Sequence, residues 1–159
     1  MRVTLLCVGA VKGSLRSTIE EYETRIGRYW RFQVTEVASG MGKGRKVDED
    51  KVRKIEEDRL LAGLPKGGGE VVTLTRDGRT LGSKDLAQFM SDRALRSVQD
   101  VTFVIGGAFG LGKGILKRAT VKLSLSPMTL PHELARLVLA EQLYRAGTIL
   151  RNEPYHKGP

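Results

Sequence analysis

The apolar and polar positions of the chain follow two alternating patterns. Short apolar or alternating runs, typical of strands, cover five stretches: residues 1–8, 32–37, 70–74, 101–105 and 121–125. Between them apolar residues recur every three or four positions, which predicts amphipathic helices: residues 14–29, 47–64, 83–95 and 131–150, with a short helical turn to about 118. Strands that alternate with helices predict an α/β fold, with a mostly parallel sheet flanked by helices on both faces. In such sheets a ligand binds at the carboxyl ends of the strands.

Two local signals refine the prediction around the third strand. The tetrad Arg-Asp-Gly-Arg at 76–79 is typical of a turn, so the strand is predicted to end at Leu74. Ser83 is the predicted N-cap of the helix that follows, because its hydroxyl can accept a hydrogen bond from a free main-chain N–H.

Residues 106–114 hold five glycines directly after a buried strand. Glycine costs main-chain entropy, so such a loop needs positive φ angles or a ligand close to the main chain. Gly107 and Gly112-Lys113 match the spacing of a P-loop, but Gly114 stands where a magnesium-binding Ser or Thr is required, which disfavours a nucleotide-hydrolysing protein. The glycine spacing of a dinucleotide-binding loop is absent. A permissive turn without any ligand is the plainer alternative.

The last predicted helix is apolar around more than half of its circumference, through Leu134, Leu137, Val138, Leu139, Ala140, Leu143 and Ala146. A helix of this kind is buried on both sides. In a chain of this length its second side most easily meets another copy, which predicts a two-fold homodimer. The alternative is a helix that lies wholly inside one subunit.

The tail from 151 to 157 gathers Arg151, Tyr155, His156 and Lys157. These residue types can stack on a base, pair with phosphate and move a proton near neutral pH. A frayed terminus is the plainer interpretation of such a tail. The chain has two histidines, so His132 and His156 are the candidates for proton chemistry near neutrality.

Charge and cysteine content narrow the class of protein. The 27 Lys and Arg against 18 Asp and Glu give a formal net charge of +9, which favours an anionic partner such as nucleic acid, although a merely basic enzyme fits too. Cys7 is the single cysteine, so an internal disulfide is impossible and a Cys/His zinc site lacks ligands; no metal is expected. The apolar run at 3–11 is too short for a secretion signal or a membrane span, and a cytoplasmic protein is expected.

Four motifs together resemble a known family: VIGG at 104–107, LSLSPMTLPH at 123–132, EQLYRA at 141–146 and PYHK at 154–157. The chain resembles the RlmH family, pseudouridine N3-methyltransferases of the large ribosomal subunit and members of the SPOUT class, over nearly its whole length. The resemblance implies one domain over 1–159, a trefoil knot at about 101–150, a tail at 151–159 and a homodimer. It also implies S-adenosylmethionine as cofactor and N3 of a pseudouridine in 23S rRNA, in the large subunit or whole ribosome, as target. A non-catalytic ribosomal RNA-binding or assembly protein with the same fold is the alternative.

The resemblance further implies a set of site residues. Cofactor binding falls to main-chain and apolar groups of Leu74, Gly106, Gly107, Leu125, Ser126, Pro127, Met128, Thr129 and Leu130. His156 and Tyr155 are expected to reach the target base from the tail, with Arg145 and His132 in support from the knot. Two plainer roles stay open: Arg145 as an ion-pair partner of Glu141 four residues earlier, and His132 as a packing or capping residue. Expected phosphate contacts are Arg2, 41–46, Lys113 and Lys117.

Overall fold

The computed structural model describes residues 1–42 and 47–156, with only the main chain of His156. Five parallel strands form one sheet in the order β2-β1-β4-β3-β5. The strands are β1 (Arg2–Val8), β2 (Arg31–Val37), β3 (Glu70–Thr80), β4 (Asp100–Ile105) and β5 (Val121–Ser124). The helices are η1 (Gly13–Leu15), α1 (Arg16–Ile26), α2 (Glu49–Gly63), α3 (Ser83–Leu95), α4 (Lys113–Arg118), α5 (His132–Leu150) and η2 (Pro154–His156). The predicted α/β fold with a parallel sheet is confirmed.

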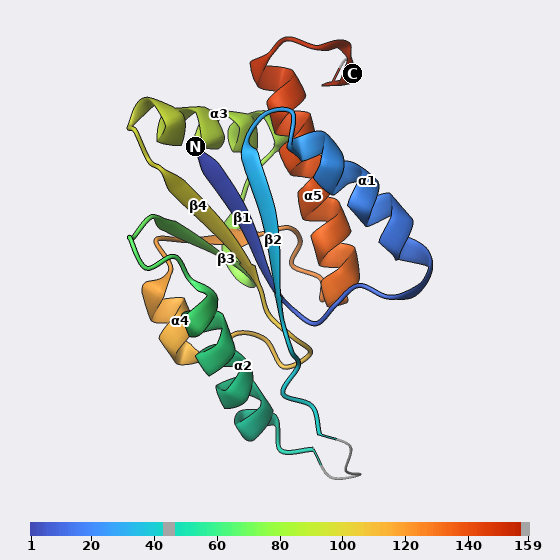
Figure 1. Cartoon of the computed structure of the whole chain (residues 1–159), viewed down its shortest axis with the longest axis vertical. Coiled ribbons are helices and arrows are strands. Elements are labelled where there is room, and N and C mark those ends of the chain that lie inside the picture. The colour runs from blue at the N-terminus through green and yellow to red at the C-terminus, as the bar shows by residue number, and fades with distance from the viewer. Residues whose placement is uncertain (43–46, 157–159) are drawn as a thin grey trace.

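Helices cover both faces of the sheet (Figure 1). α1, α3 and α5 pack on one face, where Leu5 and Phe103 belong to the larger apolar core. α2 and α4 pack on the other face, where Leu6 and Val104 belong to a second core with Ile115 of α4. Successive side chains of a strand point to opposite faces, so the two central strands, β1 and β4, are buried on both faces and mostly apolar, with Thr4 and Thr102 as buried exceptions. This double burial explains the dense apolar runs in the sequence.

The third strand is longer than predicted. β3 continues to Thr80, and Leu123 of β5 pairs with both Leu74 and Arg79, so residues 75–78 bulge out of the ladder. Gly78 crosses directly over β5, because a Cβ there would lie 2.6 Å from the carbonyl carbon of Leu123. The prediction of a strand end at Leu74 was therefore wrong: the turn-forming residues make a bulge within the strand.

The start of α3 also differs from the prediction. Ser83 is the first helical residue and Gly82 is the N-cap. The Asp85 carboxylate accepts the main-chain N–H of Gly82 at 3.0 Å, while the Ser83 hydroxyl donates to the Gln142 side chain on α5 at 2.7 Å. Ser83 is thus a contact between two helices and not a cap. The remaining predicted helices and strands lie where expected, with ends shifted by one to three residues.

The first turn of α5 is anchored to the sheet by buried charges. Arg136 is 6% exposed and donates to Glu23 of α1 at 2.7 Å and to Glu36 of β2 at 2.5 Å. Burial lowers the pKa of Arg136, but the two carboxylates outweigh burial and raise it. Beside this cluster, burial raises the pKa of the Cys7 thiol to about 12, so the thiol stays protonated. None of the helices described in residues 1–42 and 47–156 is long and apolar enough to cross a membrane.

Candidate active site

A cleft of about 1250 Å³ opens at the bulge of β3 and at the carboxyl ends of β4 and β5. Three segments form most of its wall: residues 74–77, 105–111 and 125–132. Eight of the nine predicted cofactor residues line it, namely Leu74, Gly106, Gly107, Leu125, Ser126, Met128, Thr129 and Leu130. Pro127 belongs to the same loop. The structure therefore brings together three segments that are far apart in the sequence.

The wall of the cleft combines apolar side chains with a buried hydroxyl that has no hydrogen-bond partner in the described part of the chain. Thr75 Oγ1 is buried and has no hydrogen-bond partner among the described residues. Arg76 Nη1 donates to Thr129 Oγ1 at 3.2 Å, and Ser124 Oγ donates to the Arg76 carbonyl at 3.1 Å, so the β3 bulge holds the loop after β5. A buried hydroxyl without a partner is costly unless a ligand supplies one. This hydroxyl is consistent with a polar ligand in the cleft.

Sequence analysis missed part of this wall. Thr75, Arg76 and Asp77 line the cleft because β3 bulges there. Phe109 and Leu116 contribute from the loop after β4 and from α4. The rule that ligands lie at carboxyl ends of parallel strands could have found residues 75–77, since they follow directly on the predicted strand.

The glycines of the loop after β4 are required by two buried glutamates of α2. Glu56 and Glu57 are 2% and 8% exposed, and Glu56 lies between Val52 and Leu60, four residues from each, on the buried face of that helix. A Cβ at Gly107 would lie 2.5 Å from Glu56 Oε2, and Cβ atoms at Gly112 and Gly114 would meet Glu57. Within the described loop only Gly110 has a positive φ, of 75°. Close packing on carboxylates, rather than a ligand at each glycine, therefore explains most of the pattern.

His132 lies in the cleft wall at the start of α5. Its ring packs on Gly9, where a Cβ would be 3.3 Å from Nε2, so the packing role left open by the sequence is present. Glu133 accepts the main-chain N–H of Lys12 at 3.0 Å and fixes the same turn. His132 therefore packs on Gly9 and lines the cleft at the same time.

Arg145 and Tyr155 lie together at the other end of α5. Glu141 Oε1 accepts two hydrogen bonds from the Arg145 guanidinium, at 3.0 and 2.6 Å, and one from the Tyr155 hydroxyl at 3.1 Å. The Arg145 guanidinium also stacks over the Tyr155 ring at 4.9 Å, and the ring meets Tyr144 edge-on at 4.6 Å. The ion-pair role of Arg145 left open by the sequence is thus present. The tail is docked as far as Tyr155 and is not frayed there.

The environment of the tail shifts the pKa of two phenols. Burial raises the pKa of Tyr155 far above its ordinary value, and the Tyr22 hydroxyl and Glu141 add to this shift. Burial raises the pKa of Tyr29 to about 12, together with the Glu153 carboxylate, which accepts a hydrogen bond from the Tyr29 hydroxyl. Both phenols therefore remain protonated at neutral pH and can donate hydrogen bonds, but neither can serve as a base.

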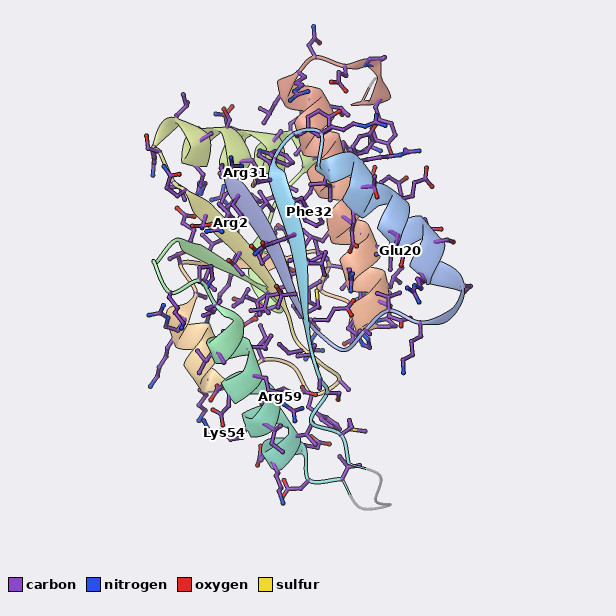
Figure 2. The ribbon with its side chains drawn as sticks, viewed as in Figure 1. Arg2, Glu20, Arg31, Phe32, Lys54 and Arg59 are labelled. Atoms are coloured by element: carbon purple, nitrogen blue, oxygen red, sulfur yellow. The ribbon has the colours of Figure 1, made fainter. Side chains whose placement is uncertain are left out.

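The predicted phosphate contacts do not all lie near the cleft. Arg2 is at the amino end of β1, opposite the cleft, where it pairs with Asp100 (Figure 2). This pairing lowers the pKa of Asp100. Lys113 and Lys117 are on α4, next to the cleft wall. Of the predicted stretch 41–46, residues 43–46 lie outside the described residues. In the described part of the chain no three His, Cys, Asp or Glu side chains gather as a metal site.

Comparison with known proteins first identifies the class of enzyme. A family model described as "Predicted SPOUT methyltransferase" matches residues 1–156. A solved structure of a probable methylase family protein from Haemophilus influenzae Rd KW20 aligns with a TM-score of 0.51 and 12% identity, over 99% of this chain and 70% of that one. At that identity the likeness concerns the fold alone, but the family match covers nearly the whole chain. The protein is a SPOUT methyltransferase.

Two curated relatives specify the family. Both are called ribosomal RNA large subunit methyltransferase H. The relative from Gemmatimonas aurantiaca is 47% identical over 158 residues, covering 99% of this chain and all of the relative, and that from Syntrophotalea carbinolica is 41% identical over 157 residues, covering 98% and 99%. The chain belongs to this family. The interpretation as a methyltransferase dependent on S-adenosylmethionine is thereby confirmed.

Proposed function

We propose that this protein methylates N3 of a pseudouridine in 23S rRNA, within the large subunit or the assembled ribosome. The observation that carries the proposal is the identity of 41–47% over the full chain with relatives named for ribosomal RNA large subunit methylation. The cleft at the bulge of β3 and the carboxyl ends of β4 and β5 provides a site for the reaction. An enzyme with this substrate acts in the cytoplasm, where ribosomes are found.

The cleft residues fit S-adenosylmethionine. When bound, this cofactor supplies a sulfonium methyl group, whose transfer is a direct displacement and depends on alignment of the reacting atoms. Leu74, Leu125 and Leu130 offer apolar surfaces to the faces of an adenine ring. The unpaired Thr75 hydroxyl and main-chain groups of the loop at 125–130 offer donors and acceptors to its edge. These residues would hold the cofactor and exclude water from it.

The target nitrogen must lose a proton before or during methyl transfer. His132, in the wall of the cleft, carries the kind of group that accepts a proton near neutral pH. Tyr155 cannot serve as the base, because the raised pKa of its phenol keeps it protonated. We assign to Tyr155 a hydrogen bond to the target base, to Arg145 stabilisation of the developing anion, and to His156 the second candidate position for the base.

We also propose a homodimer, which the separation of these groups supports. Thirteen residues separate His132 from Arg145 on α5, which is about 20 Å along the helix axis. We therefore propose that the tail of one subunit completes the cleft of another, which would bring both residues to one substrate. α5 offers a surface for such contact: Leu134 is 36% exposed, and Leu137 and Val138 on the same stripe are half-buried.

We also propose a trefoil knot within about 101–150 of a single domain spanning 1–159, with 151–159 as the tail. Two features support it. Gly78 in the β3 bulge crosses over the end of β5. The chain then runs from β5, at the edge of the sheet, to the start of α5 beside Gly9, and so passes the carboxyl ends of β3 and β4.

Transfer of a labelled methyl group tests the proposed function. Intact ribosomes, isolated large subunits and naked 23S rRNA are incubated with labelled S-adenosylmethionine, and the modified nucleoside is mapped. Ribosomes with uridine instead of pseudouridine serve as the substrate control. Variants His132→Ala and Tyr155→Phe are compared with Arg16→Ala, an exposed arginine outside the cleft.

Label on a pseudouridine, absent from the uridine control and lowered in the first two variants only, is the expected result. Binding of ribosomal RNA without any methyl transfer, with no heat of binding for S-adenosylmethionine, would instead favour a non-catalytic RNA-binding or assembly protein with this fold.

A further inference from the structure

The segment that builds most of the cleft contains no acidic residue. Between Asp100 and Glu133 there is neither Asp nor Glu. The cations of this segment lie on α4 and β5: Lys113, Lys117, Arg118 and Lys122. All four side chains are exposed, and none takes part in an ion pair within residues 1–42 and 47–156. We call these four residues the α4–β5 strip.

The strip borders the cleft. Leu116 of α4 lines the cleft, and Lys113 and Lys117 lie next to it on the helix, four residues apart and so on one stripe. Lys122 is on β5, the edge strand. Its neighbour Leu123 faces the core under α1, α3 and α5, so Lys122 faces the side of the sheet that carries α4. The cations of both elements therefore share one side of the sheet, and Leu116 connects α4 to the cleft wall.

Two cations of α2, on the same side of the sheet, are occupied. On α2, Lys54 pairs with Glu57 and Asp58, and Arg59 donates to the main-chain carbonyls of Ala38 and Ser39 (Figure 2). The four strip cations form no ion pair in the described structure, and the Glu57 carboxylate, which packs beside Lys113 at Gly112 and Gly114, is already bound by Lys54 and by the main-chain N–H of Gly114. The strip also lies on the face of the sheet opposite α5, so a dimer formed through α5 leaves it free (Figure 1).

We propose that the α4–β5 strip binds the phosphodiester backbone of the RNA and orients the target nucleotide over the cleft. The inference rests on the proposed function and adds the surface by which the substrate is held. Exposed lysine and arginine side chains that form no ion pair fit a polyanion, whose phosphates they contact without reading sequence. Approach over β5 brings the RNA to the mouth of the cleft in the same subunit.

A matched pair of double variants tests the strip. Lys117→Ala/Lys122→Ala removes two of its cations. Lys66→Ala/Arg96→Ala removes the same charge from exposed positions outside the strip, in the loop before β3 and at the end of α3. Affinity for large ribosomal subunits is measured over a series of KCl concentrations, and binding of S-adenosylmethionine is measured by calorimetry as a check on folding.

Each phosphate contact contributes about 0.7 to the steepness of the plot of log affinity against log salt concentration. Removal of two cations should therefore make this plot shallower by about 1.4, and it should lower the affinity about 25-fold at about 0.1 M salt. The control variant should keep the wild-type slope. Equal losses in both variants, or a wild-type slope in the strip variant, would overturn the assignment. Failure of the proposed function is distinct, because wild-type protein would then transfer no methyl group at all.

Discussion

The two ends of α5 differ in how fully their polar groups are satisfied. At the first turn, His132 faces a cleft whose wall includes an unpaired Thr75 hydroxyl. At the last turns, Glu141 already holds Arg145 and Tyr155, and aromatic rings close around them. The difference indicates that the first end is built to receive a ligand, and the second to present side chains already fixed in place. A single helix thus connects an open cleft at its first turn to a preformed cluster of side chains, Glu141, Arg145 and Tyr155, near its other end.

Loss of the anchor at the first turn should have the largest effect. Arg136→Met leaves two carboxylates without their partner, that of Glu23 nearly buried, and we expect a loss of about 3–5 kcal/mol in the free energy of unfolding. Urea denaturation measures it. Arg16→Met, which breaks an exposed pair with Glu20, is the control and should cost under about 1 kcal/mol. Similar small losses in both variants would show that the first turn does not depend on this cluster.

Complementation between subunits tests whether the two ends act together only across a dimer. Leu130→Asp puts a charge into the cleft wall, and Tyr155→Ala/His156→Ala removes the tail groups. Each variant alone should lose at least roughly 100-fold in methyl transfer, about 2.7 kcal/mol in activation free energy. Mixed after subunit exchange, the two should regain a substantial part of wild-type activity. If the mixture is as inactive as each variant alone, the cleft and the tail that act together belong to the same subunit.

Arg145→Gln separates the two roles of this residue. The ion pair with Glu141 is partly exposed, so its loss should lower the free energy of unfolding by under about 1 kcal/mol. Methyl transfer should fall by about tenfold if the guanidinium stabilises an anion at the target base. Arg25→Gln, which breaks a pair of the same spacing with Glu21 on α1, is the matched control. Unchanged methyl transfer in Arg145→Gln would leave this arginine with a structural role alone.

The smallest expected effect concerns Tyr29, which ties α1 to the tail. Its pKa is raised to about 12, from about 10 in the unfolded chain. The protonated Tyr29 phenol therefore makes its full contribution to stability below about pH 10, and this contribution is lost as the pH rises from there through about 12. Over that range the free energy of unfolding of the wild type should fall by about 1 kcal/mol more than that of Tyr29→Phe, because the partly exposed ring reduces the effect. Urea denaturation at a series of pH values measures the difference. Parallel pH curves for the two proteins would contradict this assignment.

Most of the sheet could be predicted because burial on both faces leaves a local signature. The apolar run at 101–105 can hardly be anything but a central strand. The bulge in β3 could not be predicted, because Arg76, Asp77 and Gly78 have the same composition in a bulge as in a turn. What decides between them is pairing with β5, a strand some fifty residues later in the chain.

The site shows the same limit. Membership in the family predicts the cleft residues, and the structure brings them together. Helical spacing does place Glu56 on the buried face, four residues from Val52 and from Leu60, but glutamates are ordinarily solvated, and nothing local indicates that Glu56 and Glu57 pack against the loop after β4. The separation of His132 from Tyr155 depends on the length and straightness of α5, which periodicity does indicate. That the tail is docked beside Glu141 depends on contacts among four aromatic rings, which no pattern in the sequence reveals.

The packing of Glu57 against two glycines restricts the order in which this protein can accept substitutions. Its carboxylate fills the space that a side chain at Gly112 or Gly114 would need, and it accepts the main-chain N–H of Gly114. A larger residue at either glycine becomes tolerable only after Glu57 has been shortened. Homologous sequences that lack a glutamate at this position should therefore be free to vary at both glycines, and the three positions should change together during evolution.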